Sequence, residues 1–442
     1  MMKPVNVGIM GCGTVGTGVA RLLMEKRQLI EQRVGVPLEL KRVADPDVSR
    51  DRGLTFPPGV FIQDAHQIVD DPQIDIVIEM IGGETLSRNL ILAAMKNGKH
   101  VVTANKALLA AHGNELFQAA EENNVDLAFE ASVGGCMPII KTLREALVAN
   151  EIHSMVGILN GTCNYILSQI TEKRLPFETA LAQAKASGYA EADPTLDIGG
   201  FDAAHKLAIL TALAYGMPIN YKDIYIEGIS AITPLDIQFA EEFGYRIKLL
   251  AISKNRGDSV EARVHPTMIA FDNILSNVSG SLNAITVNGH AVEDLFISGY
   301  GAGMMPTASA VLSDVVDLAR NLKCKAAGRV PLAAWQPAHL RPIPVMPVTQ
   351  IVTSYYFRFA VLDRPGVLSA ISGILGKYAI SIKSVHQKGR KTNGTVPIVM
   401  LSHLSREADV QNAFKEIADL DVVGSTPVLI RIEQEEDEEL TD

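Results

Sequence analysis

Apolar runs alternate with amphipathic segments along the first third of the chain. The runs VNVGIMG, LELKRVAD, IDIVIEMIG and HVVTAN are typical of buried strands, and DLAFEAS near Asp126 resembles them. Between them, apolar residues recur at helical spacing from about Thr14 to Arg33, Ala65 to Val69 and Ser87 to Asn97. Strands separated by helices in this way indicate a parallel sheet with helices on its faces. The pattern therefore predicts an α/β domain over residues 1–137.

The rhythm of the pattern changes after about residue 137. A helix is expected near Ile139 to Ala149, followed by SMVGILNGTCNYILSQI, an acidic stretch, and mixed strand and helix patterns. These features predict an α+β domain over 138–330, whose last part, about 300–330, can rejoin the first sheet. Residues 331–350 hold five prolines, which suit no regular element, so this segment is expected to be a linker.

The segment 351–433 has a pattern of its own. YYFRFAVLD, a helix after Pro365, AISIKSVHQ, TVPIVMLSHL, a helix near Ala408 to Ile417 and TPVLIRIE follow one another in the order β-α-β-β-α-β. This order is typical of a small ferredoxin-like sandwich of one antiparallel sheet and two helices. The last stretch, 434–442, is acidic and is expected to be a frayed, solvated tail.

Charge and composition exclude several classes of function. The net charge is −10, but the last ten residues hold seven acids and no base, so the remainder carries −3 from 43 acids and 40 bases. A nucleic-acid binder would need a clustered positive stripe, and the sequence has none. No apolar run approaches the roughly 18 residues that cross a bilayer, and we expect no signal peptide. Four scattered cysteines fit reduced thiols. The sequence thus predicts a cytoplasmic protein without membrane or nucleic-acid partners.

A glycine-rich turn joins the first strand to the first helix. GIMGCGTVGTGV contains Gly11, Gly13 and Gly16 in the spacing G-x-G-x-x-G, with Thr14 and Val15 opening the helix. In this context glycines let the backbone turn tightly and approach a pyrophosphate, whose charge lies at the helix N-terminus. The turn predicts a Rossmann-like domain that binds a dinucleotide, while a glycine turn without a ligand is the alternative.

The end of the second strand bears on the choice of dinucleotide. Asp45 can accept hydrogen bonds from both ribose hydroxyls and would repel a 2′-phosphate, which favours NAD over NADP. It follows Gly16 by 29 residues rather than the usual figure of about 20, because the first helix is long. Arg42, Arg50 and Arg52 lie close enough in sequence to accept a 2′-phosphate, so NADP stays an alternative.

Two lysines stand out as candidates for chemistry. VVTANKALLAAHG places Lys106 just after a strand that ends near Thr103, where ligands of parallel sheets bind. Lys206 lies in a helix that is apolar nearly all round, one turn after Asp202. A buried ammonium needs a partner, and a lysine beside a nicotinamide can take the proton of an alcohol that loses a hydride. The alternatives are a surface lysine at 106 and an exposed ion pair at 202 and 206.

The loop FEASVGGCMP, residues 129–138, is a third candidate. Its carbonyl oxygens can hold a hard cation, and its glycines let a substrate approach closely. Cys136 offers a rival hypothesis, a thiolate nucleophile that oxidises an aldehyde, although no base lies next to it in sequence and a small buried thiol is the simpler interpretation. A second rival is an amino-acid sensor without catalysis, which would have no need of Lys106 and Lys206 together.

Several long motifs resemble those of homoserine dehydrogenases, specifically the single-function bacterial type with a C-terminal ACT domain. GCGTVG resembles the cofactor loop of this family, TANKALLA its first lysine motif, EASVGGCMPI its central loop and NGTCNYIL the start of its substrate domain. GYAEADPTLDIGGFDAAHKLAIL resembles the family signature, and GYGAGMMPTASAV its late cofactor-side loop. The resemblance implies NAD(P)-dependent interconversion of L-homoserine and L-aspartate 4-semialdehyde, on the route to threonine, methionine and isoleucine.

The resemblance also implies roles for individual residues. Lys206 matches the proton donor to the aldehyde oxygen, and Lys106 the second lysine, beside cofactor and substrate. The acids that match positions around the substrate are Glu191, Asp197 and Asp202, and the sequence leaves the role of Asp193 open. Positions that match the cofactor site include Thr103 and Gly303. The sodium site of the family uses backbone carbonyls, which fall here on Glu130, Val133, Gly135 and Met137.

The segment VLDRPGVLSAISGILGKYAISIKSVHQ resembles an ACT domain. Its turn from Asp363 to Gly366 matches the place where paired modules of this kind commonly bind an amino acid. The resemblance implies feedback control with threonine as the effector, and a homodimer or homotetramer. A module that only mediates assembly is the alternative.

Overall fold

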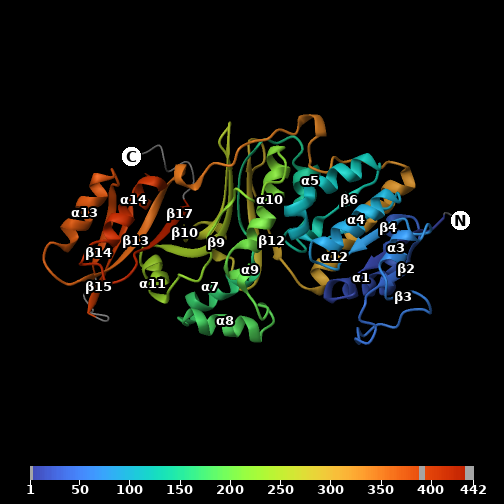
Figure 1. Ribbon diagram of the computed structural model, residues 1–442, viewed down its shortest axis with the longest axis horizontal. Helices are drawn as coiled ribbons and strands as arrows, with labels where there is room; N and C mark the ends of the chain where they lie inside the picture. The colour runs from blue at the N-terminus through green and yellow to red at the C-terminus, as the bar shows by residue number, and fades with distance from the viewer. Residues whose placement is uncertain (1–2, 388–393, 434–442) are drawn as a thin grey trace. The chain divides into compact units, whose positions relative to one another are not determined.

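The computed structural model describes residues 3–387 and 394–433, so the predicted acidic tail at 434–442 lies outside the described residues. The chain forms two compact units from segments that are not contiguous (Figure 1). The first unit comprises Met1–Gly161, Asp202–Ile224 and Leu282–Ile343, and the second comprises Thr162–Phe201, Tyr225–Ser281 and Pro344–Asp442. In the part of the chain that the structure describes, no helix has the length and apolar character needed to cross a membrane.

The first unit is built on a parallel sheet of six strands in the order β3-β2-β1-β4-β5-β6. Buried strands with neighbours on both edges need apolar side chains on both faces, and β1 and β4 are buried throughout. The predicted α/β architecture is confirmed. The strands are β1 (Val5–Met10), β2 (Leu38–Ala44), β3 (Phe61–Ile62), β4 (Ile76–Glu79), β5 (His100–Thr103) and β6 (Leu127–Ala128).

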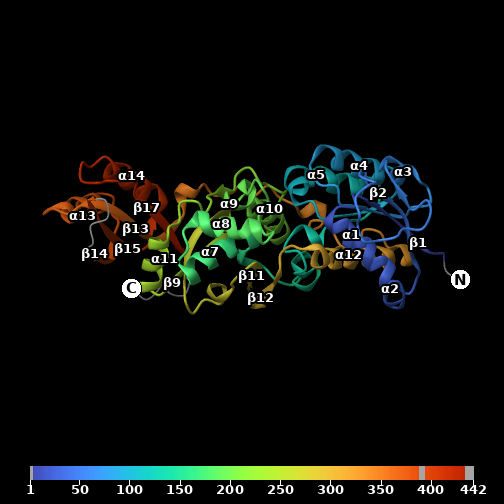
Figure 2. The same cartoon turned by 90° about the horizontal axis from the view of Figure 1, so that it is seen from below.

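The helices of this sheet differ from the expected pattern at one place. The single helix expected from Thr14 to Arg33 is two helices, because Lys26 leaves helical geometry at φ −109° and ψ 17°. Figures 1 and 2 both place α12 beside α1, and residues of both helices share one apolar core with β1. The helices are α1 (Thr14–Glu25), α2 (Arg27–Val34), α3 (His66–Asp70), α4 (Thr85–Lys96), α5 (Lys106–Glu122) and α12 (Met304–Cys324).

The remaining elements of the first unit carry the residues around Lys206. The helix expected near Ile139 to Ala149 is instead a short α6 (Ile139–Lys141) followed by a π-helical turn (Thr142–Ala146). Strands β7 (Ile152–Ile158), β11 (Leu282–Gly289) and β12 (Glu293–Tyr300) pair antiparallel in the order β12-β11-β7. Helix α10 (Phe201–Tyr215) is buried on nearly every side from Asp202 onward, as its all-round apolar pattern predicts.

The second unit contains an antiparallel pair, β9 (Tyr245–Asn255) and β10 (Val260–Ala270), with β8 (Tyr225–Ile226) parallel to β10. Its helices are α7 (Gly161–Lys173), α8 (Phe177–Ala186), α9 (Thr195–Ile198) and α11 (Pro234–Glu242). Helix α11 begins with a capping box in which the Thr233 hydroxyl accepts from the Asp236 N–H and the Asp236 carboxylate accepts from the Thr233 N–H.

The C-terminal part of the second unit has the predicted β-α-β-β-α-β order. Its antiparallel sheet has the order β17-β13-β15-β14, and Figure 2 shows α13 and α14 on the same face of it. The elements are β13 (Val352–Leu362), α13 (Val367–Lys377), β14 (Ile382–Gln387), β15 (Thr395–Ser402), β16 (Ser405–Arg406), α14 (Glu407–Ala418) and β17 (Val428–Glu433). Before it, the segment 331–350 contains the 3-10 turns Pro337–His339 and Val348–Gln350 and an isolated parallel bridge from Val345 to Val260.

Candidate functional site

The three glycines after β1 have different surroundings. Gly11 has a left-handed φ of 95°, and a Cβ there would lie 2.5 Å from the Met80 carbonyl carbon. A Cβ at Gly16 would lie 2.0 Å from the Gly11 oxygen, so only glycine lets α1 pack this closely on the turn. A Cβ at Gly13 would meet nothing within 4 Å, which leaves open space at the N-terminus of α1. The first N–H groups of α1, from Thr14 and Val15 onward, suit a pyrophosphate at that place.

Asp45 follows β2 and is engaged by its own chain. Its carboxylate accepts a hydrogen bond from the Cys12 N–H at 2.7 Å and lies 3.0 Å from the Arg52 guanidinium. Arg52 also donates to the Cys12 carbonyl at 2.8 Å, and only 5% of its side chain is exposed. The sequence predicted Arg52 as a possible partner of a 2′-phosphate but not as a partner of Asp45. In the structure, the charge of Arg52 offsets much of its repulsion toward a 2′-phosphate.

Thr103, at the end of β5, has a structural partner. Its hydroxyl donates to the buried carboxylate of Glu79 at 2.7 Å, and Glu79 also accepts from the Ile81 N–H and the Ser87 hydroxyl. These bonds tie the turn after β4 to the end of β5, next to the start of α5. Glu79 was not among the predicted site residues, although a lone acid at the end of an apolar strand could have indicated a structural or functional role.

The two candidate lysines meet at one carboxylate. Lys106 is the first residue of α5 and its Nζ lies 3.1 Å from Asp202 Oδ1. Lys206 is one helical turn after Asp202, and its Nζ lies 2.7 Å from Asp202 Oδ2. The side chain of Lys206 is only 9% exposed, whereas that of Lys106 is 37% exposed. Asp202 thus bridges an accessible ammonium and a buried one.

Two further groups fix this bridge, and both come from the turn that follows β7. The Leu159 carbonyl accepts a hydrogen bond from Lys206 Nζ at 2.6 Å. The Asn160 amide donates to Asp202 Oδ2 at 2.9 Å. The sequence identified NGTCNYIL only as a motif, and no role was predicted for Asn160. The adjacent residues Leu159 and Asn160 therefore hold the two ends of the Lys206–Asp202 pair.

The charges of the cluster decide the protonation state of Asp202. Burial alone would raise the pKa of its carboxyl, but the charges of Lys206 and Lys106, together with hydrogen bonds from Lys206 and Asn160, hold it well below its usual range. Asp202 is therefore a carboxylate at neutral pH. Beside it on α10, His205 is partly buried, and desolvation lowers the pKa of its imidazole, which favours the neutral form.

The other three acids of the signature belong to the second unit. Glu191 and Asp193 are exposed, and Asp193 accepts from the Thr195 N–H and hydroxyl, so it closes a local turn before α9. Asp197 is in α9 with an intermediate exposure, and its carbonyl accepts from the Cys163 thiol at 3.1 Å. Of the four acids in this stretch, the structure brings Asp202 together with the lysines.

Hydrogen bonds to buried acids hold the central loop, residues 129–138, in place. Two successive glycines with left-handed φ, Gly134 and Gly135, turn it, and a Cβ at Gly135 would lie 2.6 Å from the Tyr300 carbonyl oxygen. The Glu130 carboxylate accepts from the N–H groups of Ile140 and Lys141. Burial and the neighbouring Asp314 raise the pKa of Glu130 to about 7.

The oxygens assigned to a cation belong to this loop, at Glu130, Val133, Gly135 and Met137. Backbone carbonyls are the hard donors that an alkali cation prefers. Two of them have other partners, because the Glu130 carbonyl accepts from the Val133 N–H at 3.4 Å and that of Met137 from the Ile139 N–H at 2.8 Å. A carbonyl oxygen has two lone pairs, so these bonds leave room for a cation. The donor set fits sodium by its chemistry.

Cys136 lacks the features of an activated nucleophile. It is exposed, so the expectation of a small buried thiol is wrong, and among residues 3–387 and 394–433 no hydrogen bond joins its sulfur to a base. Its backbone N–H donates to the Tyr300 carbonyl at 3.2 Å. Tyr300 is followed by the glycine loop that ends at Gly303, whose φ of 119° and ψ of 150° are open only to glycine. Gly303 immediately precedes α12. The first unit therefore has a glycine turn before α12, at Gly303, as well as the one before α1, at Gly13.

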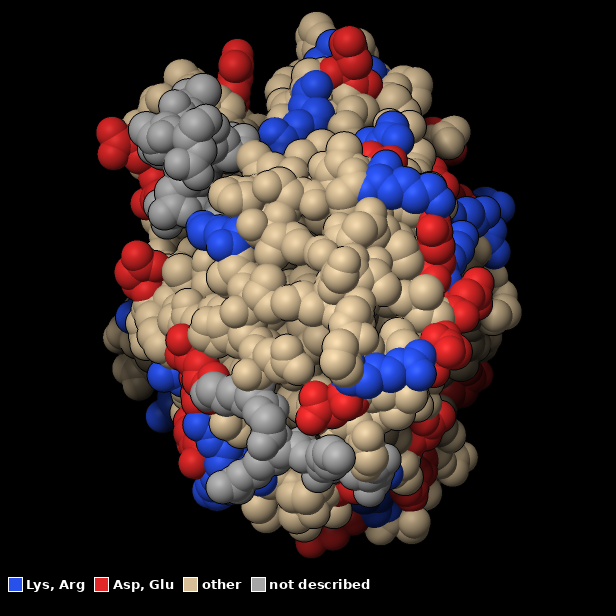
Figure 3. Space-filling model, turned by 90° about the vertical axis from the view of Figure 1, so that its left-hand side faces the viewer, with Lys and Arg blue, Asp and Glu red and all other residues tan. Residues whose placement is uncertain are grey.

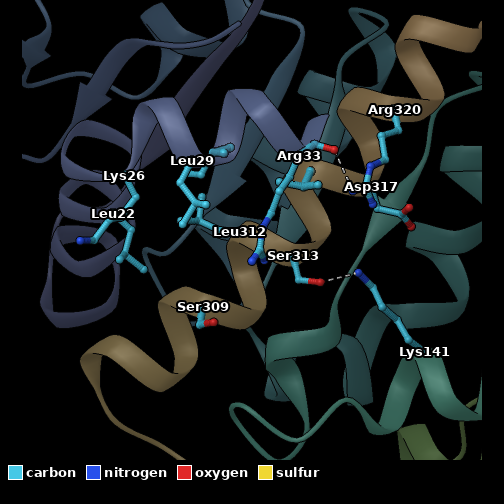
Figure 4. Close-up of a pocket in the computed structure, with 12 residues that line it drawn as sticks. Leu22, Lys26, Leu29, Arg33, Lys141, Ser309, Leu312, Ser313, Asp317 and Arg320 are labelled. Carbon is cyan, nitrogen blue, oxygen red and sulfur yellow. Dashed lines mark hydrogen bonds between the residues drawn. The ribbon is translucent and has the colours of Figure 1, made fainter. Parts of the chain in front are cut away.

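A cavity of about 400 Å³ lies near the far end of α1 from the glycine turn (Figure 4). It has an apolar floor that includes Leu22 and Leu312, and several cations line it. Two of those cations have partners within the lining, since Lys141 donates to the Ser313 hydroxyl at 2.9 Å and Arg320 donates to the Arg33 carbonyl. The lining contains neither Lys106 nor Lys206, so we assign the cavity no part in the chemistry.

Comparison with protein families gives three matches that together span most of the chain. Residues 11–130 match the family described as homoserine dehydrogenase, NAD binding domain, and residues 138–316 match homoserine dehydrogenase. Residues 355–422 match the ACT domain. The order of the matches agrees with the motifs along the sequence.

Individual relatives cover nearly the whole chain. The homoserine dehydrogenase of Neisseria gonorrhoeae is 44% identical over 98% of this chain and 99% of its own. The crystal structure of a homoserine dehydrogenase from Thiobacillus denitrificans has a TM-score of 0.93 and 44% identity, and covers 98% of this chain and 99% of that one. A hyperthermophilic archaeal homoserine dehydrogenase in complex with NADPH has a TM-score of 0.60 and 25% identity, over 73% of this chain and 98% of its own.

Proposed function

The chain belongs to the homoserine dehydrogenase family, and we propose that Lys106, Asp202 and Lys206 form the centre at which it interconverts L-homoserine and L-aspartate 4-semialdehyde. The enzyme is an NAD(P)-dependent oxidoreductase. The observation that carries the proposal is the single carboxylate of Asp202, which holds both lysine ammonium groups at about 3 Å. A bound nicotinamide supplies the acceptor or donor of the hydride.

Lys206 is the residue that moves the proton. A lysine nitrogen has four tetrahedral directions, of which one is its own side chain and two are taken by the Leu159 carbonyl and Asp202 Oδ2. One direction is left for the substrate hydroxyl. In the oxidation of homoserine, Lys206 acts as the neutral amine, whose lone pair points along this direction and takes the hydroxyl proton. In the reduction of the semialdehyde, the ammonium form donates that proton to the carbonyl oxygen.

Lys106 and the acids orient the substrate. Lys106 keeps more than a third of its side chain exposed, so it can donate to a substrate carboxylate while Asp202 holds it. Glu191 and Asp197 are acids of the kind that bind the ammonium group of an amino acid, and their positions in the family signature support this role. The carbonyls of Glu130, Val133, Gly135 and Met137 would hold a sodium ion that stiffens the central loop.

The cofactor preference depends on Asp45 and Arg52 together. We expect NAD to be favoured slightly, because the Asp45 carboxylate stands where the adenosine ribose is usually bound. Arg52→Ala removes the cation that offsets this carboxylate, so the KM for NADP should rise about tenfold relative to the KM for NAD. The measurement is steady-state kinetics with each cofactor at saturating homoserine.

Arg27→Ala is the matched control for this prediction. Arg27 is exposed and pairs with Glu39 rather than with Asp45, so the ratio of the two KM values should not change. An unchanged ratio in Arg52→Ala would mean that Asp45 does not decide the preference.

The ACT-like module is proposed to bind threonine and inhibit the enzyme. Its turn at Asp363 ends at Gly366, whose left-handed φ of 89° begins α13. The module is joined to the rest of its unit by buried charges, because Arg431 on β17 contacts Glu407 and also Glu227, next to β8. This connection supports a regulatory role rather than a freely hinged appendage.

One face of this module has few charged side chains, which supports self-association. In Figure 3 charged side chains are sparse across the middle of the face that the module presents. The module exposes large apolar side chains at Leu362, Leu368, Val385 and Leu404, each 38–41% exposed. Exposed apolar side chains and a face with few charges favour a homodimer or homotetramer, with the effector bound where modules pair.

Threonine should slow homoserine oxidation in the full chain, and Asp363→Ala should raise the concentration for half-inhibition about tenfold or more. The carboxylate is expected to bind the effector ammonium, and a lost charged hydrogen bond costs roughly 1.5–3 kcal/mol. The readout is the rate of cofactor reduction against threonine concentration. Asp419→Ala, an exposed acid after α14, serves as the control. A wild-type rate that does not respond to threonine would exclude this effector.

The function itself is tested in the reverse direction. Purified protein should oxidise NADH or NADPH when L-aspartate 4-semialdehyde is added, and Cys136→Ser should do so as fast as the wild type. No cofactor oxidation would reject the proposed reaction. Reduction of NAD or NADP by the semialdehyde that is lost in Cys136→Ser would instead favour the thiolate alternative. We propose a cytoplasmic location, which fits a chain with scattered cysteines.

A further inference from the structure

Asn283 on β11 is a buried polar residue whose amide is only half used. It has no exposed surface. Its Nδ2 donates to the Leu159 carbonyl at 2.9 Å, whereas its Oδ1 has no hydrogen-bond partner among the described residues. An apolar side chain would avoid a buried acceptor without a partner, so stability gives no reason for an asparagine at this position.

The amide lies at the point where the pairing of two strands ends. The ladder between β7 and β11 pairs Ile158 with Ala284 and ends there, so this ladder does not hold the next peptide of the β7 chain. There the Asn283 side chain supplies a hydrogen bond instead, because its amide donates to the carbonyl of Leu159, the residue after Ile158. Gly301 packs directly on the amide, since a Cβ at Gly301 would lie 2.1 Å from Asn283 Nδ2. The glycine at 301 thus leaves the space that the amide occupies.

The Leu159 carbonyl has a second donor, which is Lys206. Its oxygen accepts from Lys206 Nζ at 2.6 Å and from Asn283 Nδ2 at 2.9 Å, so both lone pairs are used. The following residue, Asn160, holds Asp202 Oδ2. A tilt of this peptide would therefore misplace the ammonium of Lys206 and the carboxylate that it contacts at the same time.

We propose that Asn283 is a positioning residue for the proton transfer, in that it locks the Leu159–Asn160 peptide and so aims the third N–H direction of Lys206 at the substrate hydroxyl. The inference rests on the proposed role of Lys206. Asn283 touches neither the reacting atoms nor Asp202, and acts only through the Leu159 carbonyl.

The test is a double-mutant cycle with Asn283→Leu and Lys206→Ala. Leucine is close to asparagine in size and has no N–H to donate. We expect Asn283→Leu to lower kcat about 10- to 100-fold, because small displacements of a catalytic group cost factors of this order. The KM for the cofactor should not change. In the Lys206→Ala background the same substitution should leave the residual rate unchanged, because no ammonium remains to be aimed.

Two controls make the outcome decisive. Asn288→Leu introduces the same substitution at the other end of β11, where the amide binds Asp294, and it should keep wild-type kcat. A serine at position 283 fits the space but is too short to reach Leu159. Asn283→Ser therefore replaces Asn283→Leu if circular dichroism shows that the leucine variant does not fold. Equal loss in both backgrounds, or no loss in the wild-type background, would overturn the positioning role. A Lys206→Ala variant with near wild-type turnover would instead reject the role of Lys206 itself.

Discussion

Lys206→Ala should lower kcat for homoserine oxidation by about 10²- to 10⁴-fold, the usual worth of a positioned proton-transfer group. The Lys206 nitrogen is buried and held by the Leu159 carbonyl and Asp202, so its removal deletes the group fixed for the proton transfer. Steady-state rates of cofactor reduction at saturating homoserine measure the effect. Dissociation constants for NAD and NADP should stay near the wild-type values, because the turn proposed to bind the cofactor is formed by other residues, Gly11, Gly13 and Gly16.

Lys222→Ala is the control for this prediction. Lys222 is an exposed lysine of the same unit, and its removal should leave both turnover and cofactor binding unchanged. Turnover near the wild-type rate in Lys206→Ala would assign the proton transfer to another group, and lost cofactor binding would show that the variant is damaged more widely.

Asp202→Asn should have the second largest effect, and on two quantities at once. The amide keeps the shape of the carboxylate but removes the charge that both lysines share, so two ammonium groups are left without their counter-charge. Breaking a buried ion pair in this way typically costs about 3–5 kcal/mol in the free energy of unfolding. Because both lysines lose their orientation, kcat should fall about 100-fold.

Urea unfolding and steady-state kinetics measure these two quantities separately. Asp193→Asn provides the matched control, because this acid of the same stretch is exposed and closes only a local turn. It should retain wild-type kcat. If Asp202→Asn unfolds at the wild-type urea concentration and keeps its rate, the carboxylate does not organise the lysines.

Local sequence patterns predict much of this arrangement. The spacing of Asp202 and Lys206 sets them one helical turn apart, and the pair forms as that spacing requires. The position of Lys106 after a parallel strand likewise places it at the edge of the sheet where ligands bind. The β-α-β-β-α-β order of the last segment follows from alternating apolar runs.

The groups that sequence patterns missed depend on long-range register. Asn283 reaches Leu159 across 124 residues of sequence, and only the antiparallel pairing of β11 with β7 brings them together. The partner of Asp45 is a similar case, since its ion pair with Arg52 depends on how the loop after β2 folds back. The break at Lys26 and the π-helical turn after α6 are local events, but small dihedral changes cause them without a helix-breaking residue.

The most direct measurement of the central claim is the transfer of deuterium from L-homoserine labelled at C4. The reaction proposed for the Lys106–Asp202–Lys206 centre moves hydride from that carbon to the nicotinamide, while the hydroxyl proton passes to Lys206. Mass spectrometry of the reduced cofactor should therefore find the label in the nicotinamide ring with the wild-type enzyme, and little reduced cofactor with Lys206→Ala. Reduced cofactor without deuterium, or equal labelling by both proteins in equal time, would contradict the account.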